Sequence, residues 1–164
     1  MEDDFPEILR GSLWHTTHPD RYRKIRESGF ILASPDLPNS ERWKANRGPS
    51  LYPYVRHIGG VSLFDFDGFD PIEYSRECPT SRWRTFVPCR SDWGKAVWIE
   101  IDRVAVRECY LSPGDLAKRQ RAENAERHTL MPRIEAAVSG RIPLAAFRRI
   151  LLYRCGTGIF EGIV

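Results

Sequence analysis

A single carboxylate stands at the head of a short apolar run in the last quarter of the chain. Glu135 precedes Ala136-Ala137-Val138, a run that predicts a buried strand. A lone acid at a strand end is often only a solvated charge on the rim of a sheet. Held rigidly above a cleft, the same carboxylate could stabilise developing positive charge or accept a proton. These residues alone leave both interpretations open.

The other polar candidates lie near the start of the chain. Leu13-Trp14-His15-Thr16 has strand character, and His15 is either a satisfied core histidine or a ligand-binding imidazole. Thr17, with Asp20 three positions later, resembles a capping box and predicts a helix over residues 18–28. Gly29 stands where a glycine commonly ends a helix.

Residues 35–57 form a proline-rich segment in which arginines alternate with aromatic residues. Arg42, Arg47 and Arg56 are the arginines of this segment, with Tyr52 and Tyr54 among its aromatics. A loop of this length in a compact domain is usually functional or disordered, and the aromatic content argues against disorder. The segment therefore predicts a loop that covers a substrate, although each arginine could instead be a surface ion-pair partner.

Gly59-Gly60 precedes the strongest strand signal of the chain, over residues 61–66. Alternation places Ser62 and Phe64 on one face of this strand. Glycines before a strand permit close approach of backbone or ligand. The alternative is an ordinary core strand with a bulge.

The whole pattern predicts a single α+β domain spanning residues 1–164, with residues 1–11 as a loose lead-in. The few helices are expected over 18–28 and 113–124, with a short one over 142–147 and minor ones within 67–95. There is no GxGxxG after a strand and no GxxxxGK[ST], so the common phosphate-binding loops are absent from the sequence. Short strands are expected near residues 13–16, 30–34, 61–66, 96–101, 135–138 and 149–153.

The composition of the chain limits which kinds of binding site, metal site and cellular location are expected. The net charge is only +3, but the cations are mostly clustered arginines, which suit phosphate recognition or a solvated basic surface. None of the four cysteines forms a CxxC pair or has a histidine at zinc-finger spacing, so no metal site is expected. No apolar segment of about 20 residues predicts a membrane span. Free thiols and the lack of a secretory signal indicate a cytoplasmic protein.

Three segments occur in a recognisable order: LWHTTHPDRYRKIRESGFI, GGVSLFDF and RIEAAVSGRIPLAAFRRILLY. Together they resemble the ADP-ribosyltransferase fold, most closely its DNA- and RNA-targeting toxins and more distantly the tRNA 2′-phosphotransferases. The resemblance implies a split β-sheet core of about six short strands with a few peripheral helices. It also implies NAD as the substrate.

The resemblance assigns roles to individual residues. Glu135 would be the catalytic carboxylate that stabilises an oxocarbenium-like ribose, and His15 would bind the adenosine-side ribose. Thr17 would help to place a phosphate at the helix start, and one or more arginines would bind the pyrophosphate. Ser62 and Phe64 would form the nicotinamide floor. The implied NAD-binding set is His15, Thr16, Thr17, Arg42, Arg47, Tyr54, Arg56, Ser62 and Phe64.

The acceptor is predicted from the segment before Glu135, which is rich in positive charge. Arg127, His128 and Arg133 are the candidate acceptor contacts, and the charge suits a DNA or RNA backbone. The resemblance implies a bacterial or phage toxin or defence effector, with an antitoxin protein as a possible partner. Open alternatives are a protein ADP-ribosyltransferase, an NAD glycohydrolase, an RNA 2′-phosphotransferase, a non-catalytic nucleotide- or nucleic-acid-binding module, and a structural partner protein.

Overall fold

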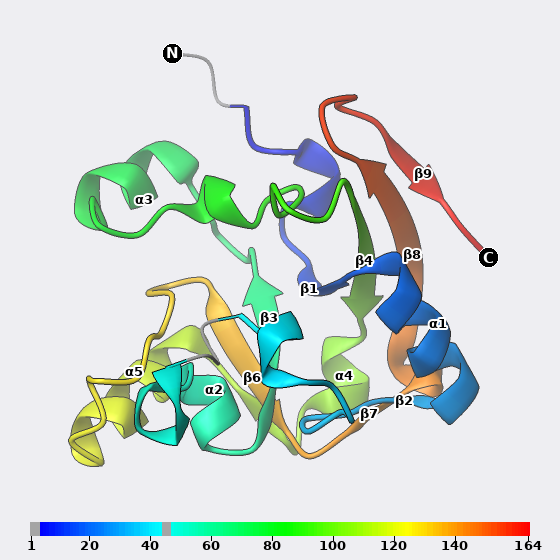
Figure 1. The fold of residues 1–164 in the computed structure, drawn as a ribbon. Helices are drawn as coiled ribbons and strands as arrows, with labels where there is room; N and C mark the ends of the chain where they lie inside the picture. Colours follow the sequence, from blue (N-terminus) through cyan, green and yellow to red (C-terminus); the bar gives the residue numbers. More distant parts are fainter. Residues whose placement is uncertain (1–3, 44–46) are drawn as a thin grey trace.

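The computed structural model describes residues 4–43 and 47–164, and it is an α+β fold built on an antiparallel sheet (Figure 1). Seven strands lie in the order β5-β6-β3-β1-β4-β8-β9, and β2 pairs with β7 in a separate two-stranded sheet. All six predicted strands are present. The strands are β1 Leu13–Thr17, β2 Phe30–Ile31, β3 Gly60–Asp65, β4 Lys95–Ile101, β5 Tyr110–Leu111, β6 Glu135–Ser139, β7 Ile142–Pro143, β8 Phe147–Arg154 and β9 Phe160–Gly162.

Five α-helices cover the sheet within the described residues: α1 Pro19–Ser28, α2 Tyr54–His57, α3 Pro71–Glu77, α4 Arg103–Val106 and α5 Pro113–Ala122. The two longer helices agree with the prediction. The capping residue of α1 differs, because the His18 ring accepts the Asp20 N–H at 3.2 Å while Thr17 belongs to β1. Gly29 ends α1 with φ 80°, as its position predicted.

The helix expected over residues 142–147 is wrong. Ile142 and Pro143 form β7, which pairs with Phe30–Ile31, and only a 3-10 turn over Leu144–Ala146 follows. The apolar run is buried by strand pairing rather than by a helix face. Tertiary context therefore overrides the local proline signal at this point.

The sheet is almost divided in its middle. β1 and β3 pair only through Leu13 with Asp65 and Trp14 with Phe64. On either side the pairing is longer, with five residue pairs between β3 and β6 and four between β1 and β4. Beyond Trp14, β1 and β3 form no further strand pairs, and the two strands separate.

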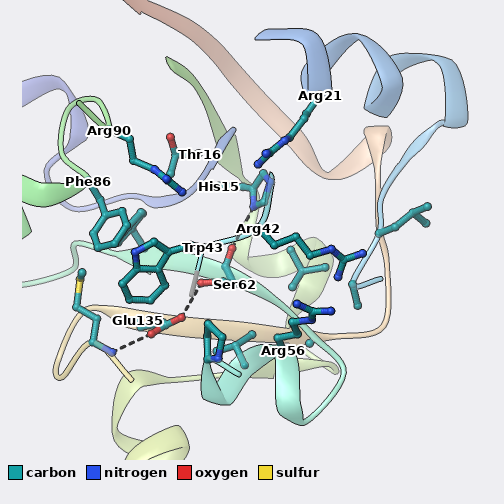
Figure 2. Close-up of a pocket in the computed structure, with 18 of the residues that line it drawn as sticks. His15, Thr16, Arg21, Arg42, Trp43, Arg56, Ser62, Phe86, Arg90 and Glu135 are labelled. Carbon is teal, nitrogen blue, oxygen red and sulfur yellow. Dashed lines mark hydrogen bonds between the residues drawn. The ribbon is translucent and has the colours of Figure 1, made fainter. Parts of the chain in front are cut away.

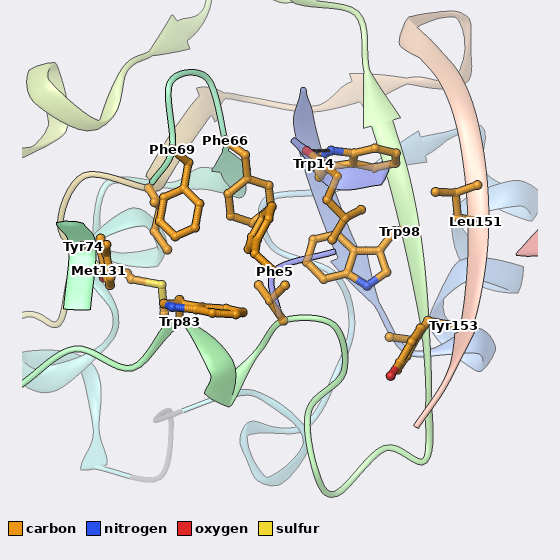
Figure 3. Packing of buried hydrophobic residues seen from close by; sticks show 14 residues of the cluster. Phe5, Trp14, Phe66, Phe69, Tyr74, Trp83, Trp98, Met131, Leu151 and Tyr153 are labelled. Carbon is orange, nitrogen blue, oxygen red and sulfur yellow. Dashed lines mark hydrogen bonds between the residues drawn. The ribbon is translucent and has the colours of Figure 1, made fainter. Parts of the chain in front are cut away.

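The two faces of the sheet carry separate apolar clusters, as strand alternation requires. Trp14, Phe66 and Trp98 pack on one face (Figure 3), and Leu13 and Ile99 lie in the cluster on the other. Trp14 and Trp98 meet edge to face, with their ring centroids 6.3 Å apart. Burial on both faces makes the strands rigid supports for the side chains at their ends.

Residues 1–11 were expected to be a loose lead-in, and this expectation is wrong for residues 4–11. Residues 1–3 lie outside the described part of the chain. Phe5 and Leu9 are buried in the cluster around Trp14, and the Trp14 indole donates to the Leu9 carbonyl at 2.9 Å. Two apolar side chains in an otherwise acidic segment are enough to anchor it, because the aromatic cluster offers them a matching surface.

The cysteines also differ from the expectation of four free thiols. Cys89 and Cys155 form a disulfide across 66 residues of sequence, and Cys78 and Cys109 are free. Sequence spacing could not reveal this pair, because only the fold brings the β4 loop beside the end of β8. In the described part of the chain, no helix has both the length and the apolar character needed to cross a membrane.

Candidate active site at the opening of the sheet

A cavity of about 270 Å³ lies where β1 and β3 separate (Figure 2). His15 and Thr16 line it from β1, Ser62 and Phe64 from β3, and Glu135 from β6. Segments that are far apart in sequence therefore contribute to one site. The opening supplies the depth that a continuous sheet would lack.

Glu135 is held by two hydrogen bonds and is only 7% exposed. Its Oε1 accepts from the Ser62 hydroxyl at 2.8 Å, and its Oε2 accepts from the Met131 backbone N–H at 2.8 Å. Figure 2 shows both bonds at the floor of the cavity. With each oxygen engaged, the carboxylate has one orientation, which is the pre-organisation that catalysis needs.

Burial raises the pKa of Glu135, and the two hydrogen bonds to its charged form oppose that rise. The net direction is upward from the ordinary glutamate value. The carboxyl group therefore needs a higher pH than an exposed glutamate to become fully ionised.

His15 reaches the same cavity from β1, across the gap from β3. Alternation places His15 on the Leu13 side of β1, whereas Glu135 lies on the Phe64 side of the sheet. Because the strands have parted, the imidazole points into the gap, and its Nδ1 donates to the Ser62 carbonyl at 3.0 Å. Burial lowers the pKa of His15, so the ring is neutral at pH 7 and its Nε2 carries a free lone pair.

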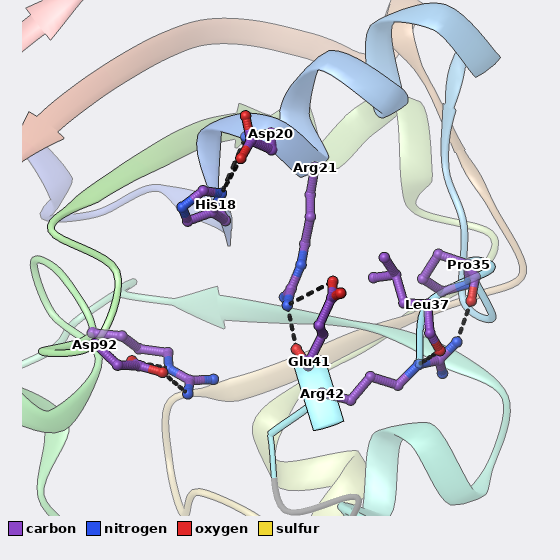
Figure 4. A network of polar contacts seen from close by, with 9 residues as sticks. His18, Asp20, Arg21, Pro35, Leu37, Glu41, Arg42 and Asp92 are labelled. Atoms are coloured by element: carbon purple, nitrogen blue, oxygen red, sulfur yellow. Dashed lines mark hydrogen bonds and ion pairs between the residues drawn. The ribbon is translucent and has the colours of Figure 1, made fainter. Parts of the chain in front are cut away.

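Four arginines surround the cavity, namely Arg21, Arg42, Arg56 and Arg90. Arg42 donates to the carbonyls of Pro35 and Leu37 (Figure 4). It also lines an adjoining cavity of about 400 Å³ that includes Thr17. Both cavities contain His15, Arg21 and Arg42, so they meet at these residues.

Arg56 is held with its guanidinium 3.6 Å from the Tyr52 ring, and it donates to Asn39 at 3.0 Å. Arg47 does not share this location, because it is exposed and lines neither cavity. Two polar atoms at the cavity are buried without a hydrogen-bond partner among the described residues: Thr16 Oγ1 and Arg56 Nη1. Buried polar atoms are normally satisfied, so these two mark a place where a ligand would complete the bonding.

Aromatic side chains form another wall. Trp43 and Phe86 meet edge to face at 4.8 Å, and Phe86 lies 6.2 Å from Phe64. Tyr54, in contrast, is fully buried away from the cavity and donates its hydroxyl to Glu123 at 2.8 Å. The expected place of Tyr54 in the NAD-binding set is therefore wrong, because its ring packs in the cluster that joins α2 to α5.

Two of the three expected acceptor contacts are engaged elsewhere. His128 is 1% exposed, its Nδ1 donates to the Tyr52 carbonyl at 2.7 Å, and its ring stacks on His57 at 3.9 Å. Arg133 forms ion pairs with Glu73 at 3.5 Å and with Glu77. Arg127 is exposed in the turn after α5. Thr17 is also misplaced, because its side chain is buried in β1 and lines only the adjoining cavity.

Cavity residues that were not predicted from the sequence include Arg21, Trp43, Phe86, Arg90 and Met131. Arg21 had a usable signal, since it lies four positions before the buried Ile25 and so shares its helix face. Phe86 and Arg90 had none, because they come from a segment without periodicity.

Among the described residues, no three His, Cys, Asp or Glu side chains come together in a way that could hold a metal ion. The chemistry available at the opening is therefore that of one fixed carboxylate, a neutral imidazole, a hydroxyl and several guanidinium groups. Comparison with protein-family models gives no match for this chain, and no curated protein sequence is significantly similar to it.

Proposed function

We propose that the protein is an NAD-dependent ADP-ribosyltransferase that modifies a nucleic acid. The observation that carries the proposal is the shared cavity of Glu135 and His15, bordered by four arginines. A fixed carboxylate beside guanidinium groups suits a substrate that combines a sugar bond to be cleaved with a pyrophosphate.

Transfer begins as the bond between nicotinamide and ribose C1 breaks and nicotinamide leaves with the electron pair. Positive charge then develops on the ribose, and the Glu135 carboxylate stabilises it electrostatically. The acceptor atom forms the new bond to C1, and Glu135 can take up the proton that the acceptor loses. Ser62 and the Met131 N–H keep the carboxylate in position throughout.

The residues present fit NAD as the substrate. The two cavities that meet at His15 have volumes of about 270 and 400 Å³ and together lie in the size range of small-molecule sites. Arg42 lies at the junction of these cavities, where a pyrophosphate between two nucleosides would lie. Thr16 Oγ1 and Arg56 Nη1 supply unpaired polar atoms for its hydroxyl and phosphate oxygens.

The nucleic acid acceptor and the biological role rest on the sequence resemblance. With His128 and Arg133 engaged in the fold and Arg119 paired with Glu123, the exposed cations that remain between residue 118 and Glu135 are Lys118, Arg121 and Arg127. These suit a phosphate backbone. A toxin or phage-defence effector with an antitoxin partner is the role that we propose.

The direct test uses NAD labelled in its adenylate part, incubated separately with DNA, RNA and a protein extract. We expect label on nucleic acid together with release of free nicotinamide. Label on protein alone would contradict the acceptor, and free ADP-ribose without a labelled acceptor would indicate a glycohydrolase. No nicotinamide release under any condition would contradict the proposed activity itself.

Removing the Ser62 hydroxyl should shift the acid limb of the pH–rate profile to higher pH. The Ser62 bond favours the charged form of Glu135, so Ser62→Ala raises the pKa of Glu135 further above the ordinary glutamate value. Activity needs the carboxylate, so it is lost as the pH falls through that pKa. Nicotinamide release measured between pH 4 and pH 9 would show the shift, and an unmoved acid limb would contradict it.

Arg42 and Arg47 provide a matched pair within one loop. We expect Arg42→Ala to raise KM for NAD by at least roughly tenfold, because a charge-assisted hydrogen bond contributes about 1.5–3 kcal/mol. Arg47→Ala should leave KM unchanged, since Arg47 is exposed outside both cavities. Equal effects of the two substitutions would show that the pyrophosphate is bound elsewhere.

A further inference from the structure

One wall of the cavity is a loop without helix or strand. The loop runs from residue 86 to residue 94, between the 3-10 turn Trp83–Thr85 and β4. Phe86, Arg90 and Trp93 of this loop line the cavity. Their positions depend on how the loop is fixed to the rest of the molecule.

The loop is held at its middle by the disulfide from Cys89 to Cys155, which lies just after β8. Non-covalent contacts also hold the loop: the Trp98 indole donates to the Pro88 carbonyl at 2.6 Å, and the Cys155 N–H donates to Gly94 at 2.9 Å. Val87 is buried in the core cluster, and Phe86 and Trp93 pack against it, so the disulfide is the covalent tie among several contacts. Cys155 is exposed and Cys89 is half-buried. A small dithiol can therefore reach the exposed sulfur.

We propose that the disulfide between Cys89 and Cys155 is a redox clasp that holds this wall of the cavity in its binding conformation. A dithiol reductant opens the clasp, becoming a disulfide itself, and delivers two electrons and two protons that convert the bond to two cysteine thiols. The reduced protein has lower affinity for the ligand of the cavity. The identity of that ligand as NAD rests on the proposed function.

Arg90 transmits the change, because it is the direct neighbour of Cys89 in sequence. Its guanidinium is paired with Asp92 at 2.7 Å and lies 5.1 Å from the Trp93 ring centroid, so the side chains form one unit within the loop. Opening the disulfide removes the covalent tie at the base of this unit. Ligand binding must then order it again.

The expected effect is on affinity rather than on the chemical step. Ordering two mobile side chains, Arg90 and Trp93, should raise KM for NAD by roughly tenfold, since each immobilised side chain costs a factor of about two to ten. Glu135, Ser62 and His15 lie on strands of the sheet, and kcat should therefore change little.

The experiment compares three full-length proteins with and without dithiothreitol: wild type, Cys89→Ser/Cys155→Ser and Cys78→Ser/Cys109→Ser. Nicotinamide release gives KM and kcat, and hydrogen exchange reports on the amides of residues 86–94. We expect reduction to raise KM and accelerate exchange in wild type and in Cys78→Ser/Cys109→Ser. The Cys89→Ser/Cys155→Ser protein should show the raised KM in both conditions.

Unchanged KM and unchanged hydrogen exchange on reduction would contradict the proposed role of the disulfide. A response of KM or exchange to dithiothreitol that persists in Cys89→Ser/Cys155→Ser would also contradict it. Titration of four thiols in the unfolded, air-oxidised wild type would also overturn it, since only Cys78 and Cys109 should react. Absence of nicotinamide release in every state would contradict the proposed function alone. Hydrogen exchange would then still decide whether the disulfide holds the loop.

Discussion

Glu135→Gln should reduce transfer of ADP-ribose by about a thousandfold or more in kcat, with little change in KM for NAD. Among the described residues that line the cavity, Glu135 supplies the one acidic group, and its charge is needed only as positive charge develops on the ribose. A neutral amide cannot supply that stabilisation. Initial rates of nicotinamide release and of label transfer, measured on the same preparations, would give both constants.

The fold should survive this substitution. The glutamine carbonyl can accept from the Met131 N–H, and its amide group can donate to the Ser62 hydroxyl, which is able to reverse its role. Glu161→Gln is the matched control, because Glu161 is exposed on the edge strand β9. Full activity in Glu135→Gln would show that the carboxylate is a structural group, and it would revive the 2′-phosphotransferase alternative.

Arg103→Ala should lower the free energy of unfolding by about 2–3 kcal/mol. Breaking a fully buried ion pair costs about 3–5 kcal/mol, and the loss here should be smaller because the Arg103 side chain is 36% exposed. Arg103 donates to both oxygens of Asp65, at 2.8 and 2.5 Å, and the Tyr110 hydroxyl also donates to this carboxylate. Asp65 ends β3, so the network joins the central strand to α4 and β5. The variant leaves a buried carboxylate without its cation.

The control for this prediction is Arg107→Ala at the end of α4. Arg107 pairs with Glu108, but the two side chains are 71% and 84% exposed, so the loss should stay below about 0.5 kcal/mol. Urea unfolding of the three proteins would compare them. Equal losses for Arg103→Ala and Arg107→Ala would show that the Asp65 network does not stabilise the fold.

The difference between wild type and Arg103→Ala should also depend on pH. Burial alone would raise the pKa of Asp65, but the bonds from Arg103 and Tyr110 outweigh it and hold the pKa below the ordinary value. The contribution of the pair is therefore complete above about pH 4, the unfolded value, and is lost as the pH falls through the native pKa. Unfolding measured from pH 7 down to pH 3 should show the two proteins converging.

The elements that the sequence predicted well share one property: their signal is local. β3 and β4 combine β-branched and aromatic residues with alternation, and α5 begins at Ser112, which accepts the Asp115 N–H at 3.1 Å as an N-cap should. β7 was mistaken for a helix because its two residues become a strand only through β2. Residues 67–95 show no hydrophobic periodicity, so the sequence predicted only minor helices in this segment. It gave neither the bounds of α3 nor the position of the loop that lines the cavity.

Among the candidate site residues, strand position was the better guide. It placed five residues in one cavity and failed for Thr17, whereas residue type in the loop segment placed Arg42 and Arg56 there but not Arg47 or Tyr54. The five strand residues are His15, Thr16, Ser62, Phe64 and Glu135. Tyr54 was taken from the loop region by residue type alone, and it is buried in the core. The same reasoning failed for His128 and Arg133, because residue type says nothing about which neighbour a loop side chain will meet.

The sequence by itself determined the α+β class, the six principal strands and the two longer helices, because hydrophobic period and capping residues act within a few positions of the chain. Only the tertiary structure decided that β1 and β3 separate after Trp14, which lets His15 and Glu135 reach one cavity from opposite sides of the sheet. It also decided which arginines face that cavity and which cysteines pair. These outcomes depend on contacts between distant segments, whose energies no local pattern encodes.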